Sequence, residues 1–342
     1  MDSWITALTW RGEAPSVGHP HRPPGDRGRR GARGNPAANR TGSGRPGLSW
    51  CDVRRRRERT PDGRRHDRQE GCLDRPPDPL PTRVNTLPDL PATYHRALEA
   101  GLPAIGVELS RDARATIDDH VRLLLAWNSA INLTAIRDPA AIAIRHVVDS
   151  LTGLRVLREM RVTRILDLGS GAGFPGLPLV VALPWARALL VESVGKKARF
   201  LETVVAATGL GDLVRVEAAR AEDLARRGGV PRGSAVVARA VAPLADLIEL
   251  ALPLVGSGGR LIAWKGASAL DEGPTGEIAS ARRALDAISP GGGMSVEAAI
   301  PKDAGESVRD LRDHYLVVVT RGPGPIADHW PRDPAVRRRH PW

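Results

Sequence analysis

The sequence predicts an α/β fold built on an open, mostly parallel sheet. From residue 164 onward, short apolar runs alternate with helical segments, which is typical of βαβ units. The first apolar run leads directly into a glycine-rich turn, where a helix then begins. The predicted strands are 164–168, 187–192, 213–217, 234–239 and 259–264, and the predicted helices are 175–183, 195–208, 221–226, 243–254 and 276–288.

The last two apolar runs predict how the sheet ends. Residues 294–300 and 314–320 have no obvious long helix between them, so we expect them to form an antiparallel pair at the sheet edge. A dinucleotide-binding fold would more often continue with parallel units. An antiparallel final strand is the mark of the class I adenosylmethionine-dependent methyltransferase sheet, which has a Rossmann-like arrangement.

A small helical cap is predicted ahead of this sheet. Residues 111–127 carry apolar side chains close to helical spacing. Asp138 and Pro139 provide an N-cap and a first helical residue for a segment that should run to about Leu157. We therefore assign residues 86–160 to a helical cap and residues 161–320 to the methyltransferase domain.

The basic charge lies at the two ends of the chain. The 342 residues carry a net charge of +11, to which residues 1–85 contribute +8 (18 Arg, 10 Asp and Glu) and residues 321–342 contribute +3. Residues 86–320 are formally neutral, with 27 basic and 27 acidic residues. A nucleic-acid-binding face on the central part would therefore have to be a local patch.

The two ends are predicted to lie outside the fold. Residues 1–85 are rich in Arg, Pro and Gly and should be disordered. They are either an arginine-rich RNA-binding arm or a solvated extension from an upstream start codon, and we favour the extension. Residues 321–342 are expected to form a mobile basic tail.

Cysteine content and hydropathy limit the class of protein. Cys51 and Cys72 both lie in the N-terminal segment, so the central part cannot be a disulfide framework or a cysteine metal site. No metal is expected. No early apolar run is long enough to span a bilayer, and no signal peptide is visible. These features predict a soluble, cytoplasmic protein, which we expect to be a monomer.

The glycine-rich turn is the most informative motif. Ile165 to Gly176 reads as a buried strand and a turn in which Gly169, Gly171 and Gly173 let backbone approach a ligand closely. Asp167 would repel a phosphate but suits a cation or an amine, and adenosylmethionine carries both. The turn also fits the dinucleotide fingerprint, and a turn with purely structural glycines is the third interpretation.

Polar residues follow each predicted parallel strand. Ligands of open parallel sheets bind beyond the carboxyl ends of the strands. Each residue alone is compatible with a solvated strand end, but together they form a row along one edge. The row consists of Asp167 with the glycine turn, Glu192, Ala221 and Glu222, Arg239, and Lys265.

These motifs and several outside the sheet resemble a known family. The chain closely resembles the bacterial small-subunit ribosomal RNA (guanine-N7) methyltransferases, also called glucose-inhibited division protein B, over about residues 88–320. The matching elements are Trp127-Asn128, Asn132-Leu133-Thr134, Arg137-Asp138-Pro139, Arg145-His146, Asp149-Ser150, the turn from Asp167 to Gly176, Glu192-Ser193, Lys196-Lys197, Phe200-Leu201, Arg239-Ala240 and Lys265-Gly266.

The resemblance implies a cofactor and an acceptor. It implies that Gly169 and Phe174 contact S-adenosylmethionine, that Ala221 and Glu222 frame its adenine, and that Arg239 contacts the cofactor or lies beside it. Glu192 stands where methyltransferases hold the ribose. The implied acceptor is N7 of a guanine in 16S ribosomal RNA. Because N7 carries a free lone pair and no proton, no general base is expected, and no catalytic residue is assigned.

Substrate contacts are less determined by the sequence. The candidates are His146, Lys196, Lys197, Arg239 and Lys265. His146 and Asp149 form either a substrate-binding pair or a hydrogen-bonded structural pair, and we favour the structural pair. The two lysines at a helix start are either phosphate contacts or solvated. A methyltransferase of small molecules or proteins, and a non-catalytic cofactor- or RNA-binding protein, remain the alternatives.

Overall fold

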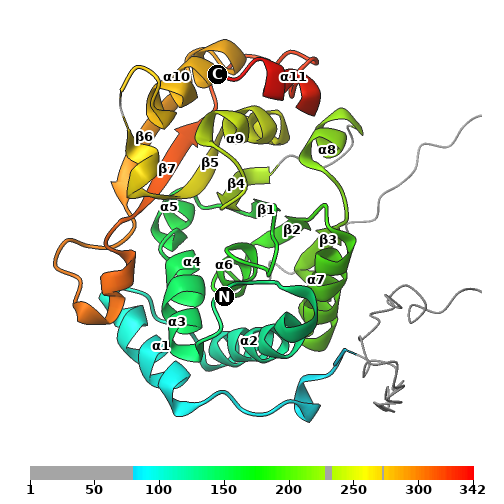
Figure 1. The fold of residues 1–342 in the computed structure, drawn as a ribbon, viewed down its shortest axis with the longest axis vertical. Coiled ribbons are helices and arrows are strands. Elements are labelled where there is room, and N and C mark those ends of the chain that lie inside the picture. The colour runs from blue at the N-terminus through cyan, green and yellow to red at the C-terminus, as the bar shows by residue number, and fades with distance from the viewer. Residues whose placement is uncertain (1–79, 228–232, 272) are drawn as a thin grey trace, which may run out of the picture. The chain divides into compact units, whose positions relative to one another are not determined.

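A twisted, mostly parallel sheet forms the centre of the part of the chain that the structure describes (Figure 1). The computed structural model describes residues 80–227, 233–271 and 273–342. Its seven strands have the order β3-β2-β1-β4-β5-β7-β6. They are β1 (Arg164–Leu168), β2 (Arg187–Val191), β3 (Val214–Glu217), β4 (Gly233–Arg239), β5 (Val255–Gly266), β6 (Gly293–Ala298) and β7 (His314–Thr320).

The predicted antiparallel ending is confirmed. Strands β1 to β5 pair in parallel, whereas β7 runs antiparallel to both β5 and β6. The last strand of the chain is thus inserted between β5 and β6, so β6 forms the edge of the sheet. The alternation of apolar runs and helices predicted the parallel strands to within a few residues at most ends, and β5 begins earlier than expected.

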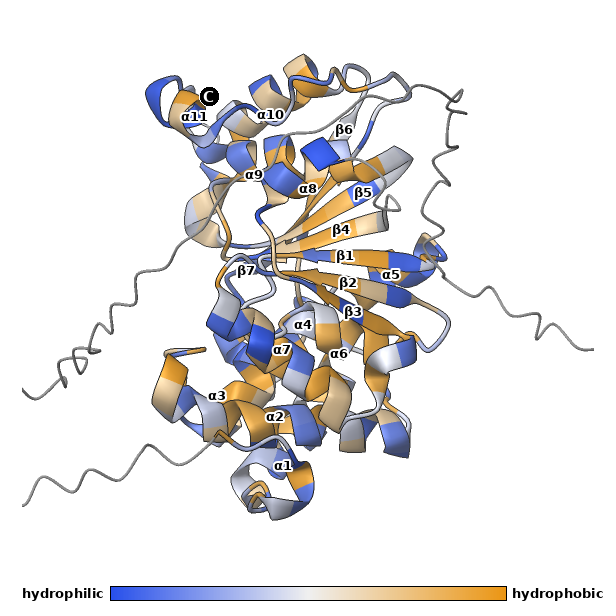
Figure 2. Cartoon of the chain, turned by 90° about the vertical axis from the view of Figure 1, so that its right-hand side faces the viewer, coloured by the Kyte–Doolittle hydropathy of each residue, from blue (hydrophilic) through white to orange (hydrophobic). Residues whose placement is uncertain are grey.

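Helices cover both faces of the sheet. Alternate strand residues point to opposite faces, so Ile165 packs in one apolar cluster and Leu166 in the other. Figure 2 shows the apolar strands in the middle and helices with polar outer sides. On the Ile165 face lie α1 (Ala92–Ala104), α2 (Arg111–Ile131), α3 (Pro139–Ile142), α4 (Asp149–Leu151), α5 (Leu154–Glu159), α6 (Gly176–Val181) and α7 (Gly195–Ala207); on the Leu166 face lie α8 (Ala221–Arg227), α9 (Leu244–Ala251) and α10 (Glu277–Ile288).

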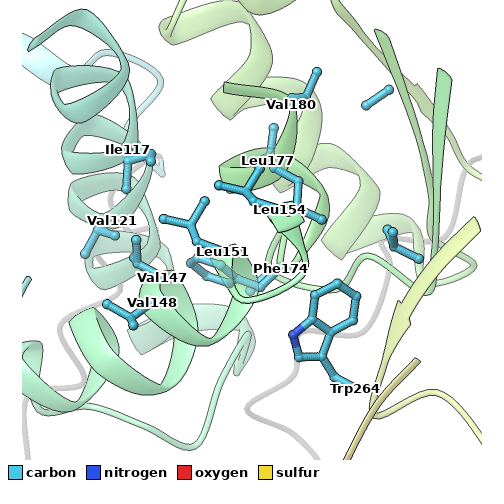
Figure 3. Close-up of a cluster of buried hydrophobic side chains, with 14 of the residues drawn as sticks. Ile117, Val121, Val147, Val148, Leu151, Leu154, Phe174, Leu177, Val180 and Trp264 are labelled. Atoms are coloured by element: carbon cyan, nitrogen blue, oxygen red, sulfur yellow. The ribbon is translucent and has the colours of Figure 1, made fainter. Parts of the chain in front are cut away.

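The helical cap has the predicted starts. Asp138 accepts a hydrogen bond from Ala141 N at 2.7 Å and Pro139 occupies the first turn of α3, as the sequence indicated. Ala143–Val148 then form a π-helical segment between α3 and α4. Figure 3 shows the apolar side chains of α2, the segment before α5, and α6 meeting around Phe174 and Trp264.

A polar turn connects the cap to the site. The side chain of Asn128 is bonded to both backbone groups of Thr134, N and O, at 2.9 Å each. Asn132 closes α2 in the left-handed conformation, with φ of 48°. Asn128 therefore fixes the position of Thr134 in the segment after α2.

Parts of both predicted ends belong to the fold. Most of residues 1–85 lie outside the described residues, but residues 80–85 belong to the folded part, because Trp127 Nε1 donates to Pro81 O at 2.7 Å and Val84 packs against the core. Residues 321–342 are not a free tail. They include α11 (Pro334–Arg339) and bond to α8 and α9. Among the described residues, no helix is long and apolar enough to cross a membrane.

Candidate active site

The glycine turn lies at the carboxyl end of β1. Gly169, Gly171 and Gly173 have φ of 70°, 55° and 90°, the left-handed region that favours glycine. Gly169 N donates to Val191 O at 2.8 Å, which ties the turn to β2. A Cβ on Gly169 would lie 2.8 Å from a methyl carbon of Val241, so the turn has no space for a side chain there.

Asp167 lies beneath the turn. Its side chain is fully buried, and Oδ2 accepts a hydrogen bond from Gly176 N at 3.0 Å. Oδ1 has no hydrogen-bond partner among the described residues. Asp167 lines neither of the two cavities at this edge of the sheet, so its observed contact is with the start of α6, where it shapes the turn.

Burial raises the pKa of Asp167 to about 7, which predicts a pH effect on stability. Unfolded aspartate has a pKa near 3.9, so between about pH 4 and 7 the folded chain holds a proton that the unfolded chain has released. Stability without cofactor should therefore fall as the pH rises through this window. Asp167→Asn keeps an oxygen acceptor for Gly176 N and should remove this dependence, which is at most about 1.4 kcal/mol per pH unit.

Urea unfolding at several pH values between 4 and 8 measures this effect. The matched control is Asp212→Asn, because Asp212 is exposed. The slope of unfolding free energy against pH should change in Asp167→Asn and stay as in the wild type in the control. Equal slopes in all three proteins would show that Asp167 is ionised throughout.

Glu192 joins the turn to the helix after β2. One carboxylate oxygen accepts from Gly171 N at 2.9 Å and the other from Val194 N at 2.7 Å. The side chain is buried, with 6% exposed. Each oxygen has a further lone pair, so this geometry leaves Glu192 able to accept hydrogen bonds from two vicinal hydroxyls.

Two cavities meet at Gly169. One, of about 290 Å³, lies over the ends of β2 and β3 and includes Ala221 and Glu222 in its lining, next to Ser193 and Val241. The other, of about 350 Å³, lies toward the helical cap. It is lined by the turn and by Thr134, Arg145, His146, Asp149, Lys197, Arg239 and His314.

Phe174 forms the floor between the turn and the cap. Its ring is stacked between those of His120 and His146, with centroids 4.6 and 4.9 Å away. The Arg239 guanidinium carbon lies 5.6 Å from the same ring. His120 is buried, which lowers its pKa to about 4, and its Nε2 donates to Ala172 O at 2.7 Å. A neutral histidine thus holds the turn from below.

Arg239 connects three polar groups of the cap. It donates to Asp149 Oδ2 at 2.8 Å, to Arg145 O at 2.9 Å and to His146 Nδ1 at 3.0 Å. Asp149 is buried, and its Oδ1 lies 2.9 Å from Nδ1 of His314. This hydrogen bond raises the pKa of His314. The predicted His146–Asp149 pair is therefore bridged by Arg239.

The protonation of His146 follows from this network. Burial and the neighbouring Arg239 charge lower its pKa to about 3, so the imidazole is neutral at physiological pH. Because Nδ1 accepts from Arg239, the proton is on Nε2, which donates to Thr134 Oγ1 at 2.7 Å. Both ring nitrogens are engaged, which agrees with the structural interpretation of the pair.

The three candidate lysines differ in position. Lys197 lines the cap-side cavity and Lys196 is exposed on the same turn of α7. Lys265 lines neither cavity: it pairs with Glu277 at 2.5 Å and donates to Ala242 O at 2.9 Å. The contacts of Lys265 thus link β5 to α10 and to the loop after β4.

Sequence reasoning missed several residues of the site. His120 stands in the apolar stripe of α2, between Ile117 and Leu124, and a polar residue at such a position is a usable signal. His314 opens β7, and the antiparallel direction of that strand places its first residue at the ligand edge. Arg337, which lines the cavity near Glu222, comes from the C-terminal segment, and no local pattern indicates it.

The sheet and its strand-end residues define a class of enzyme. A sheet of order 3-2-1-4-5-7-6 with an antiparallel seventh strand, a glycine turn after β1 and a carboxylate after β2 is the arrangement of the class I S-adenosylmethionine-dependent methyltransferases.

Comparisons with known proteins give the family. A family model described as rRNA small subunit methyltransferase G matches residues 113–285. Ribosomal RNA small subunit methyltransferase G of Chloroflexus aggregans is 40% identical over 240 residues, which is 70% of this chain and 94% of the relative. The protein of the same name from Roseiflexus castenholzii is 41% identical over 219 residues, 64% of this chain and 87% of the relative.

The chain belongs to the rRNA small subunit methyltransferase G family. It is a methyltransferase, and its cofactor is S-adenosylmethionine. Among solved structures, the fold is similar to that of the O-methyltransferase from Bacillus cereus in complex with SAH. That similarity has a TM-score of 0.44 and 15% identity, over 64% of this chain and 95% of that chain.

Proposed function

We propose that this protein transfers the methyl group of S-adenosylmethionine to N7 of a guanine in 16S ribosomal RNA. The observation that carries the proposal is the pair of cavities that meet at Gly169, one beside the cofactor residues and one beside the family-specific cap residues. A cofactor in the first cavity and an acceptor base in the second would adjoin at the glycine turn.

The described residues fit the cofactor. Glu192 lines neither cavity, but it is bonded to the turn and has free lone pairs for the ribose hydroxyls. Gly169 has no side chain and lines the cavity of about 290 Å³. Ala221 and Glu222 line the same cavity, where the adenine would lie. When bound, S-adenosylmethionine supplies an electrophilic methyl group on a sulfonium. Phe174 and the turn would exclude water from the reacting atoms.

The cap-side residues orient the acceptor rather than take a proton from it. His146 is neutral with both nitrogens bonded, and Asp149 is occupied by Arg239 and His314. Guanine N7 has an available lone pair, so alignment and water exclusion suffice. Orientation of this kind can lower a barrier by about 7–11 kcal/mol. Guanine O6 is a second acceptor. The contact with Asp149 favours the protonated form of His314, which would have a donor for this oxygen.

Two basic side chains at the rim suit the RNA backbone. Lys197 lines the cap-side cavity and makes no hydrogen bond or ion pair with the described residues, and Arg145 is exposed at the same rim. Phosphate contacts position a nucleic acid without selecting its sequence. We therefore assign Lys197, with Lys196 beside it, to the RNA backbone, and we assign no substrate contact to Lys265. The macromolecule that this enzyme binds as its substrate is then 16S RNA or the small ribosomal subunit.

The test is to map 7-methylguanosine in ribosomal RNA from cells with and without this protein. A single guanine of 16S RNA should lose the modification in its absence and regain it on complementation. In vitro, methyl-labelled cofactor should transfer label to the same nucleotide in purified RNA or small subunits. Label found only in protein or small molecules would indicate a different acceptor. Cofactor binding without any transfer would indicate a non-catalytic protein.

A further inference from the structure

The C-terminal segment is fixed to the Leu166 face of the sheet by a buried carboxylate. Glu249 on α9 is fully buried, and Arg332 donates to both of its oxygens, from Nε to Oε1 at 3.1 Å and from Nη2 to Oε2 at 2.7 Å. The backbone N of Arg332 and Nε1 of Trp342 also donate to this carboxylate, at 2.7 and 2.9 Å. Such a paired, bidentate contact holds geometry well.

Two tryptophan rings pack against Arg332 beside Glu249. Trp330 and Trp342 are stacked with centroids 5.6 Å apart. The guanidinium carbon of Arg332 lies 4.5 Å from the Trp342 ring and 5.6 Å from the Trp330 ring. We call residues 326–342 the C-terminal strap. Arg332 and Trp342 both bind Glu249, and helix α11 lies between these two residues in the chain.

One arginine of the strap lines the cavity of about 290 Å³, which we call the adenine-side cavity. Arg337 on α11 lines that cavity together with Gly169, Ala221 and Glu222. Its Nη2 donates to the Glu222 carboxylate, and its side chain is 12% exposed. Nη1 is buried and has no hydrogen-bond partner among the described residues. Figure 1 shows α11 beside α8, which carries Glu222.

We propose that Arg337 is a cofactor-positioning residue and that the C-terminal strap is a wall of the adenine site. A buried N–H group without an acceptor is uncommon in folded proteins. The ring nitrogens of adenine are acceptors, and one of them would complete the bonding of Nη1. The proposal rests on the cofactor site proposed above. It adds a contact from outside residues 113–285, the part of the chain that matches the family model.

Variants of Arg337 can separate the role of Nη1 from that of Nη2. Glu222 fixes Nη2, so the planar group holds Nη1 in one direction. Arg337→Ala removes both donors, whereas Arg337→Lys keeps the charge beside Glu222 but has no second donor in a fixed fork. Arg338→Ala is the matched control, because Arg338 is exposed on the same helix and makes no hydrogen bond or ion pair with the described residues.

Calorimetric titration of the full chain with S-adenosylhomocysteine tests the proposal. We expect about tenfold weaker binding in Arg337→Ala, about threefold or more in Arg337→Lys, and unchanged binding in Arg338→Ala. Circular dichroism of each variant checks folding; if Arg337→Ala does not fold, Arg337→Lys decides. Wild-type affinity in both Arg337 variants would overturn the proposal, because Arg337 would then only hold α11 to α8.

Two further outcomes separate this proposal from others. Tighter binding in Arg337→Ala would also overturn it, because the strap would then obstruct the site. If the wild-type chain bound no S-adenosylhomocysteine at all, the proposed cofactor site itself would be wrong. A wild type that binds, with Arg337 variants that bind equally well, leaves the cofactor site intact and removes only the role of Arg337.

Discussion

Replacing Gly169 by Asp is expected to abolish binding of S-adenosylmethionine, with affinity at least 100-fold lower. A Cβ at this residue would lie 2.8 Å from Val241, and the residue lines both cavities, so the substitution adds a charged side chain where they meet. The affected backbone is the one that must approach the cofactor. Calorimetric titration with S-adenosylhomocysteine measures the effect directly.

Backbone strain alone does not account for this expectation. Asp tolerates the left-handed region better than most residues, and Gly209 offers a matched control. Its φ is 69° against 70° at Gly169, and a Cβ there would meet nothing within 4 Å. Gly209→Asp should bind the cofactor as the wild type does. Retained affinity in Gly169→Asp would mean that the turn does not contact the cofactor.

Replacing Arg239 by Ala is expected to cost about 3–5 kcal/mol of folding stability, and methyl transfer with it. The change leaves the buried Asp149 carboxylate without its cationic partner and removes the donor to His146 Nδ1. The stack of His146 on Phe174 depends on the same network. Urea unfolding gives the loss of stability, and labelled-methyl transfer to small-subunit RNA gives the loss of activity.

A surface pair between α8 and the end of β3 provides the comparison. Arg227 pairs with Glu217 at 2.6 Å, but the two side chains are 54% and 35% exposed. Solvent screens such pairs, so Arg227→Ala should cost less than about 1 kcal/mol and leave methyl transfer unchanged. Similar losses of stability in both variants would contradict the assignment of Arg239 as the centre of a buried network.

The local sequence pattern was sufficient to predict the strands of the sheet but not the attachment of the C-terminal segment. Strand β1 has the bounds predicted from its apolar run, because a buried parallel strand needs a continuous apolar segment before the turn. The same reasoning predicts a mobile basic tail for residues 321–342, because they contain Pro, Gly and the run Arg337-Arg338-Arg339. Their attachment depends on Glu249, a buried charge on a distant helix, and such a partner has no local signature.

The site was predictable where one element determines it. The structure places Gly169, Ala221 and Glu222 around one cavity, and Glu192 is bonded to the glycine turn, because these residues follow strand ends that meet at one edge. Lys265 satisfied the same criterion, yet it pairs with Glu277 from α10. A position at a strand end therefore predicts the region in which a side chain lies. The direction of the side chain depends on its charged partners, which here come from another helix.

The strand order has a consequence for synthesis of the chain. Strand β6 pairs with β7 alone, and β5 pairs with β7 on the side away from β4. During translation, β6 therefore has no partner strand, and β5 is paired only with β4, until residues 314–320 have left the ribosome. Until then the edge of β5 exposes unpaired backbone groups, which invite pairing with other chains. Emergence of β7 thus covers the edge of β5 and gives β6 its partner in a single step.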